Sequence, residues 1–111
     1  MQMTPGEIVD KYTIAKLCIE KLGNDREGAD ELEFGVVELR KKYPTVPWDE
    51  LIRLVHRVNG FIWDFEEPIH LGRLDEEPIM AGILSIRVRK LNVVRVELGG
   101  LINKLTDGGR R

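Results

Sequence analysis

The chain has 111 residues and a formal net charge of -2, with 42% hydrophobic and 32% charged residues, a composition typical of a folded globular protein. This length allows one domain with one core, which we expect to span residues 1–111, and the balanced charge offers no basic surface for nucleic acid. No apolar run approaches the ~20 residues that span a bilayer, and residues 1–5 lack the pattern of a secretory signal, so we expect a cytoplasmic protein that binds neither nucleic acid nor membrane.

The first predicted helix covers residues 5–22 and starts with strong capping signals. Thr4 precedes Pro5, whose missing N–H suits the first helical turn, and Glu7 completes a capping-box pattern. Gly23 is expected to end the helix. The apolar residues that recur every three or four positions, and that we expect to face the core, are Ile8, Tyr12, Ala15, Ile19 and Leu22.

Prolines mark the boundaries of the next two predicted helices, residues 27–42 and 47–66. The second helix ends before Pro44, because a residue that precedes proline avoids the α conformation. The third begins with Pro47 at its first helical position, and Pro68 is expected to end or kink it. The core-facing residues of these two helices are predicted to be Leu32, Val36, Leu39, Tyr43, Leu51, Val55, Val58, Ile62 and Phe65.

The last predicted helix, residues 76–106, is apolar on two different faces. At about 100° per residue, one face has the spacing of a core stripe and consists of Leu84, Val88, Leu91, Val94, Leu98, Leu101, Ile102 and Leu105. The roughly opposite face carries Ile79, Gly82, Ile86, Val93 and Gly100. A chain of this size buries only one such face against itself, so the second face predicts a partner.

These elements predict an all-α fold. Residues 83–96 are the best candidate for a strand because they contain several β-branched residues, but they follow the helical period more closely. No internal repeat divides the chain. We therefore expect an antiparallel helical bundle of three long helices plus one shorter helix.

No motif indicates catalysis, and we expect neither a cofactor nor a metal site. The sequence has no phosphate-binding glycine loop, no nucleophile elbow and no metal-type spacing around His56 or His70. Cys18 lies among helical apolar residues, and we interpret it as a small buried hydrophobe. An alternative is a metal-dependent nucleotide-processing enzyme that uses carboxylates one helical turn apart, Glu7 with Asp10 and Asp64 with Glu67.

Arg87 and Arg95 lie, by helical phase, beside the core-facing leucines of the last helix. An unpaired buried guanidinium is costly, so each is expected to reach a carboxylate or to extend outward into solvent. Asparagines inside helices usually make hydrogen bonds and are expected to join them. The predicted buried polar network, which we interpret as structural, comprises Asp10, Asn59, Asp64, Glu66, Arg87, Asn92 and Arg95.

One flank of the third predicted helix gathers both tryptophans with hydrogen-bonding side chains. Its members are Trp48, Ile52, His56, Asn59, Trp63 and Glu66. Such a set can form the wall of a ligand site, but tryptophans that pack against a neighbouring helix are the commoner outcome. We interpret the flank as a packing surface.

Three motifs along the chain can be compared with a known pattern. Residues 4–20 read TPGEIVDKYTIAKLCIE, residues 59–66 read NGFIWDFE, and residues 91–103 read LNVVRVELGGLIN. Together they resemble a group of small all-helical prokaryotic proteins that have no assigned activity. The resemblance implies a helical-bundle scaffold and carries no chemistry over to this chain.

The chain departs from that pattern in its last helix, where residues 79–84 read IMAGIL and residues 98–102 read LGGLI in place of more polar residues. A glycine inside a helix costs about 1 kcal/mol relative to alanine. The glycines Gly82, Gly99 and Gly100 therefore favour the close approach of another backbone. One hypothesis is a natural helical scaffold whose surface was redesigned for self-assembly.

We interpret the second apolar face of the last helix as a surface for self-association, so that the protein is a symmetric homo-oligomer rather than an enzyme. The expected interface residues are Ile79, Gly82, Ile83, Ile86, Val93 and Gly100. Phe34 and Val37 of the second helix are candidates to join them. An exposed aliphatic patch of this kind on a monomer invites aggregation. A third hypothesis, an adaptor for another protein, uses the same face.

Overall fold

The computed structural model describes residues 3–23 and 28–107, and these residues form four helices. The helices are α1 (Pro5–Leu22), α2 (Ala29–Lys42), α3 (Trp48–His70) and α4 (Pro78–Asp107). No strand occurs in this part of the chain. The predicted all-α class and helical bundle, with α2 as the shorter helix, are confirmed. The expected start of the second helix at residue 27 lies outside the described residues.

The start of α1 shows the predicted capping box. The backbone N–H of Glu7 donates to Thr4 Oγ1 at 3.2 Å, and the backbone N–H of Thr4 donates to Glu7 Oε1 at 3.3 Å. These bonds satisfy two amides that the first turn of a helix leaves without intrahelical partners. Gly23, with φ of 69°, ends the helix in the left-handed conformation that glycine adopts readily. Both ends of α1 therefore follow from local sequence.

The predicted end of the third helix is wrong, because α3 continues through Pro68 to His70. Pro68 lies in the last turn, so its missing N–H removes only one helical hydrogen bond. Its carbonyl still accepts from the backbone N–H of Arg73 at 3.0 Å. The chain then turns at Gly72, whose φ is 73°. A proline in the last turn of a helix therefore does not end the helix before the proline itself.

Two other boundaries differ by a residue or two from the prediction. Pro47 precedes α3 as its N-cap residue instead of occupying the first helical position. The last helix begins at Pro78, and its first intrahelical bond runs from Ala81 N–H to the carbonyl of Glu77. Helix ends commonly shift by this amount, and the shifts leave the faces of α3 and α4 unchanged.

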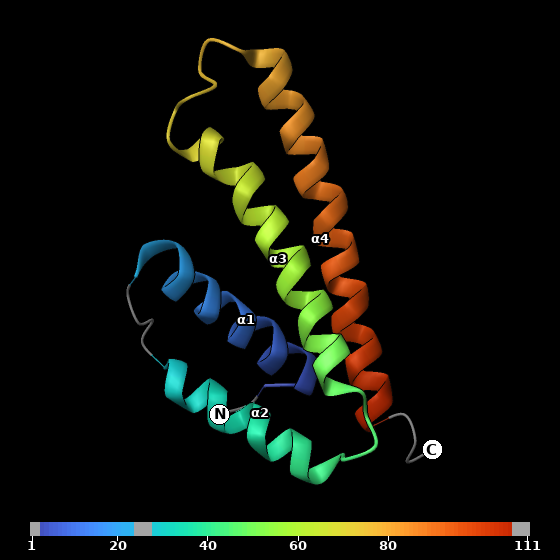
Figure 1. Cartoon of the computed structure of the whole chain (residues 1–111). Helices are drawn as coiled ribbons and strands as arrows, with labels where there is room; N and C mark the ends of the chain where they lie inside the picture. The colour runs from blue at the N-terminus through green and yellow to red at the C-terminus, as the bar shows by residue number, and fades with distance from the viewer. Residues whose placement is uncertain (1–2, 24–27, 108–111) are drawn as a thin grey trace.

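The helices are arranged as a long hairpin and a short one (Figure 1). α3 and α4 run antiparallel and form the long hairpin, while α1 and α2 lie against its lower half, with α1 between α2 and α3. The molecule measures 51 × 31 × 23 Å. The upper half of the α3–α4 hairpin therefore extends beyond α1 and α2.

The hydrophobic core lies at the lower end, where all four helices meet. Its buried members are Val9, Leu39, Trp48, Leu51, Val55 and Ile102. The indole N–H of Trp48 donates to the carbonyl of Tyr43 at 2.9 Å, so this buried tryptophan has its polar atom satisfied. Trp48 packs as a core residue.

The predicted core stripe of α4 is only partly buried. Ile102 is fully buried, but Val94, Leu101 and Leu105 are 41%, 44% and 43% exposed. The reason is that, within the described part of the chain, α4 packs mainly against α3 along its length and against α1 near its lower end. The flank of α4 that faces away from α1 is left uncovered.

The predicted stripe of α1 is also shifted. Ile19 and Leu22 are exposed, whereas Val9, Thr13 and Leu17 are buried. α1 lies between α2 on one side and the long hairpin on the other, so it buries two faces near its start. A single amphipathic stripe could not represent a helix that is covered from two sides.

Candidate functional site

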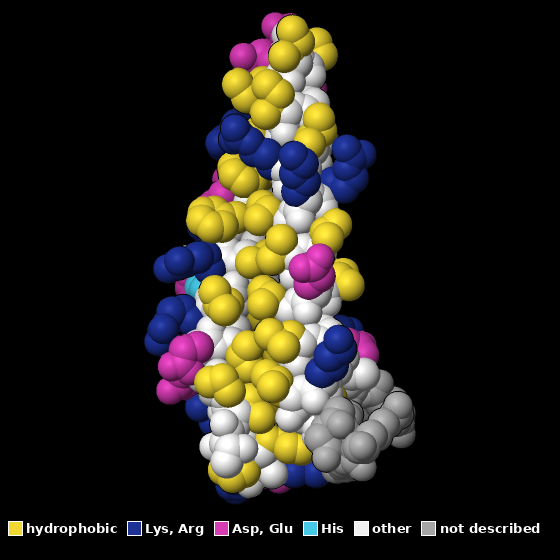
Figure 2. All heavy atoms as spheres, turned by 90° about the vertical axis from the view of Figure 1, so that its right-hand side faces the viewer, with side chains coloured by type: hydrophobic (Ala, Val, Ile, Leu, Met, Phe, Trp, Pro, Cys, Tyr) yellow, Lys and Arg dark blue, Asp and Glu magenta, His cyan; other side chains and the backbone are white. Residues whose placement is uncertain are grey.

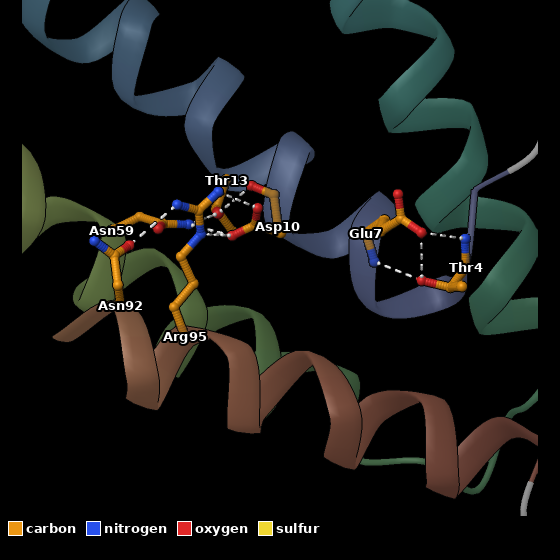
Figure 3. A network of polar contacts seen from close by, with 7 residues as sticks. All are labelled: Thr4, Glu7, Asp10, Thr13, Asn59, Asn92 and Arg95. Carbon is orange, nitrogen blue, oxygen red and sulfur yellow. Dashed lines mark hydrogen bonds and ion pairs between the residues drawn. The ribbon is translucent and has the colours of Figure 1, made fainter. Parts of the chain in front are cut away.

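A polar network joins α1, α3 and α4 around a bidentate ion pair (Figure 3). Arg95 of α4 donates through Nε to Asp10 Oδ1 at 2.8 Å and through Nη2 to Asp10 Oδ2 at 2.6 Å. Asn59 of α3 donates through Nδ2 to Asp10 Oδ1 at 3.0 Å and to Thr13 Oγ1 at 2.9 Å. Asn92 accepts a longer bond, 3.4 Å, from Arg95 Nη1. Three helices are thus linked through one carboxylate.

Burial and pairing act in opposite directions on the Asp10 carboxyl. Burial by itself raises its pKa, but the hydrogen bonds from Arg95 and Asn59 together with the charge of Arg95 outweigh burial and lower the pKa below the usual value. The hydrogen bond to Asp10 raises the pKa of Arg95. Asp10 and Arg95 are therefore a stable ion pair at neutral pH.

Four of the seven predicted network residues meet here, namely Asp10, Asn59, Asn92 and Arg95. Two other carboxylates point elsewhere: Asp64 is exposed and pairs with Lys21 at 3.0 Å, and Glu66 lies 3.5 Å from His70 of the same helix. The positions of Asp64 and Glu66 on α3 place them nearer the upper part of the hairpin than Asn59.

Arg87 is likewise separate from the network. Its guanidinium lies 5.8 Å from the centre of the Phe65 ring, in a cation–π arrangement on the α3–α4 hairpin. The side chain extends to the surface, which is the second of the two outcomes expected for a core-flanking arginine. The position of Arg87 around the α4 helix therefore predicted that it would contact a neighbouring helix, but not that its partner would be an aromatic ring.

Thr13 and Asn103 were not among the predicted site residues, and both add hydrogen bonds at the contacts of α1 with its neighbours. Thr13 is fully buried, accepts from Asn59 and donates to the carbonyl of Asp10 at 2.8 Å. Asn103 of α4 accepts from the backbone N–H of Gly6 at 2.8 Å. A polar side chain one helical turn after Asp10, and an asparagine within α4, were the available signals.

A cleft of about 440 Å³ opens beside the network, between the start of α1 and the lower part of α4. Its polar lining includes Asp10, Arg95 and Asn103, each of which already has a hydrogen-bond partner within the chain. The first amides of α1 are also engaged, with Thr4 and Asn103. We therefore interpret the network as a structural one that holds α1, α3 and α4 together.

The start of α1 approaches the backbone of α4 directly. A Cβ atom added to Gly6 would overlap the carbonyl of Gly99, whereas a Cβ atom added to Gly99 itself would meet nothing within 4 Å. A close approach of two backbones thus occurs inside the chain at Gly6, a position that the sequence did not indicate. The close approach of a partner backbone at Gly82, Gly99 and Gly100 stays a prediction. Added Cβ atoms at Gly82 and Gly100 would also meet nothing within 4 Å, so these two glycines face open space.

The four carboxylates of the predicted enzyme alternative are engaged with different groups. Glu7 belongs to the capping box, Asp10 binds Arg95, Asp64 pairs with Lys21, and Glu67 accepts from the indole of Trp63 at 3.3 Å. Within residues 3–23 and 28–107, no group of three or more His, Cys, Asp or Glu side chains is placed to hold a metal ion. The structure does not assemble these residues into one site.

The flank of α3 predicted as a packing surface is divided among several contacts. Asn59 joins the polar network, His56 lies 3.0 Å from Glu20 of α1, and Trp63 contacts Glu67. Trp48 belongs to the core. These side chains therefore do not converge on one ligand wall.

All six predicted interface residues are exposed in the single chain. They lie along the length of α4 and are Ile79, Gly82, Ile83, Ile86, Val93 and Gly100. Ile79 is 81% exposed and Val93 is 55% exposed. Phe34 and Val37 are also exposed, but on α2, which lies on the other side of α1 from the long hairpin.

The exposed apolar surface is wider than predicted because it includes the flank of α4 and part of α3. Leu54 and Phe61 of α3 are exposed, as are Val94, Leu101 and Leu105 of α4. Figure 2 shows hydrophobic side chains at intervals along the long hairpin, interrupted in its upper half by a band of Lys and Arg side chains. We call the exposed apolar residues of α4, from Ile79 to Leu105, the α4 face.

Comparison of the chain with protein-family models, with curated proteins and with solved structures gives no match. None of the helices in the described part of the chain combines the length and the apolar character that crossing a membrane requires.

Proposed function

We propose that this chain is a non-enzymatic, cytoplasmic helical protein that associates with copies of itself through the α4 face. The observation that carries the proposal is the exposure of large aliphatic side chains along a 30-residue helix. Exposed apolar side chains gathered along one element commonly mark sites of protein association. The proposal applies equally to a natural surface and to a redesigned one.

The conformation of the hairpin supports the proposal. Among the described residues, the upper part of α4 packs against α3, and none of them covers Ile79, Ile83 or Ile86. Burying an aliphatic side chain of this type contributes about 1.5 to 3 kcal/mol. Covering several of them with a second copy would yield enough free energy to offset the entropy lost on association.

The polar network, which lies on the side of α4 that faces α1, also supports self-association through the α4 face. Asp10, Asn59 and Arg95 satisfy one another and fix α1 against the long hairpin. Since the polar groups hold the fold together, the apolar residues on the opposite face of α4 remain for contact with a partner.

The test is the mass of the protein in solution, measured by sedimentation or light scattering at micromolar concentration. The unmodified chain should form an oligomer, and Val93→Asp should shift it to the monomer because a carboxylate would be buried without a partner. Leu22→Asp is the matched control, since Leu22 is 59% exposed but lies on α1, outside the α4 face.

Two results would contradict the proposal. One is a monomeric unmodified protein at micromolar concentration. The other is an unchanged mass for the double variant Ile86→Asp with Val93→Asp, provided that circular dichroism shows the helices intact. Equal dissociation by the Val93 and Leu22 variants would place the contact outside the α4 face.

A further inference from the structure

The exposed residues of α4 follow two interleaved seven-residue series. One series is Ile79, Ile86, Val93 and Gly100, and the other is Ile83, Lys90, Glu97 and Lys104; all eight are exposed. Residues seven apart lie on nearly the same side of a helix, with a drift of about 20° per seven residues. The two series together form a seam along α4 of the kind that pairs with another helix.

From this seam we infer that two copies pair antiparallel along α4, about a two-fold axis that passes close to Val93. The inference rests on the proposed function and names its partner, a second copy of the chain, together with the orientation and register of the contact. It follows from the charges, the glycines and the length of the helix.

The charges on the seam distinguish the two possible orientations. A parallel, in-register pair would set Lys90 against Lys90 and Glu97 against Glu97, so each charged position would face its own kind. An antiparallel pair about Val93 sets Lys90 of each copy beside Glu97 of the other. Because the axis repeats every contact, the dimer gains two attractive pairs where the parallel arrangement would have repulsive ones.

The same register accounts for both open glycines. Ile86 and Gly100 lie seven residues on either side of Val93, so the Ile86 side chain of one copy is placed over Gly100 of the other. Gly82 and Lys104 are each eleven residues from Val93, so the long stem of Lys104 is placed over Gly82. A Cβ atom at either glycine would meet no atom of the described residues within 4 Å, which leaves room for these side chains.

The length of α4 favours the same axis. Val93 lies at the middle of the helix Pro78–Asp107, so a two-fold axis there makes the two helices overlap along their full length. A helix of 30 residues is about 45 Å long and about 10 Å wide, or roughly 450 Å² of face before flanking side chains are added. Stable interfaces bury about 800 Å² per partner, so even the full overlap needs its flanking side chains to approach that area, and a shorter overlap would fall further below it.

Disulfide trapping tests the orientation directly. In a Cys18→Ala background, one chain carries Ile86→Cys and another carries Gly100→Cys, and the two are mixed and oxidised with copper phenanthroline. The antiparallel register predicts a mixed disulfide between the two chains as the main product. Efficient self-linking of the Ile86→Cys chain alone would indicate a parallel pair and overturn the inference.

Charge exchange tests the register. Lys90→Glu and Glu97→Lys, made singly, should each raise the dimer dissociation constant about tenfold, because both symmetric pairs become repulsive. The double variant Lys90→Glu with Glu97→Lys should restore the original value. A double variant no tighter than the single ones would contradict the pairing of these two residues.

The two proposals fail in different ways. A monomeric unmodified protein removes both the proposed function and the antiparallel register. An unmodified dimer that Val93→Asp dissociates, but that gives no mixed disulfide and no rescue by charge exchange, retains self-association through α4 and overturns only the antiparallel register.

Discussion

At the scale of single residues, the pair of Asp10 and Arg95 determines how α1 is fixed to α4. Both carboxylate oxygens of Asp10 accept from the guanidinium, and the geometry is bidentate. We predict that Asp10→Asn lowers the free energy of unfolding by about 2 kcal/mol at neutral pH, less than for a fully buried pair because the Arg95 side chain is 34% exposed. Urea denaturation measures this loss.

The loss should depend on pH with a definite sign. The folded pKa of Asp10 is lowered, so the pair adds stability above the pKa of the unfolded chain, near 3.9, and this stability declines as pH falls through the folded pKa. Asp10→Asn has no group to titrate at this position. The difference between the two proteins should therefore narrow below about pH 4. A difference that stays constant down to pH 2 would exclude the ion pair as its cause.

Candidate members of this network could be predicted from the sequence, but which of them would pair with each other could not. Helical phase placed Arg87 and Arg95 on the same side of α4 and left Asp10, Asp64 and Glu66 as candidate partners. The outcome depends on where α1 crosses the long hairpin, which brings Asp10 to Arg95 and leaves Arg87 beside Phe65. Periodicity within one helix does not contain that information.

At the scale of the helices, the contact between α1 and α4 depends on the missing side chain of Gly6. We predict that Gly6→Ala destabilises the fold by about 2 kcal/mol, because the added methyl would overlap the Gly99 carbonyl and push the backbones apart. The amide of Gly6 would also lose its bond to Asn103. Thermal denaturation measures the change.

Gly99→Ala is the matched control for this contact. The added Cβ would meet nothing within 4 Å, so the substitution should stabilise α4 by up to about 1 kcal/mol through helix propensity. Opposite signs for the two variants are the expected result. If both were stabilising, α1 would not lie against α4 at this point.

The helices themselves were predictable wherever the signal was local. The start of α1 followed from Thr4, Pro5 and Glu7, which interact within one turn. The extent of burial on α4 could not be predicted in this way, because it depends on which helices lie beside α4. α1 is 18 residues long and cannot cover a helix of 30 residues. Leu101 and Leu105 have the spacing of core residues and yet lie at the surface.

At the scale of the whole molecule, the proposed self-association would make the stability of the fold depend on protein concentration. A chain that buries part of its apolar surface only on association gains stability from mass action, so its melting temperature should rise with protein concentration. The compact lower end, with the core and the polar network, would hold each copy together. The upper end of the hairpin would gain most from the partner.

A substitution at Gly100 should affect the stability of the single chain and the stability of the assembly in opposite directions. Gly100→Ala should favour the helix of the single chain by up to about 1 kcal/mol, as Gly99→Ala does. The same methyl would occupy the space that the antiparallel register assigns to Ile86 of the second copy, so association should weaken. We therefore expect a higher melting temperature at low concentration and a smaller rise with concentration than for the unmodified protein, with Gly99→Ala keeping the full rise. Melting curves recorded over a hundredfold range of concentration would show the difference in slope, and equal slopes for the two alanine variants would mean that Gly100 does not lie at the contact.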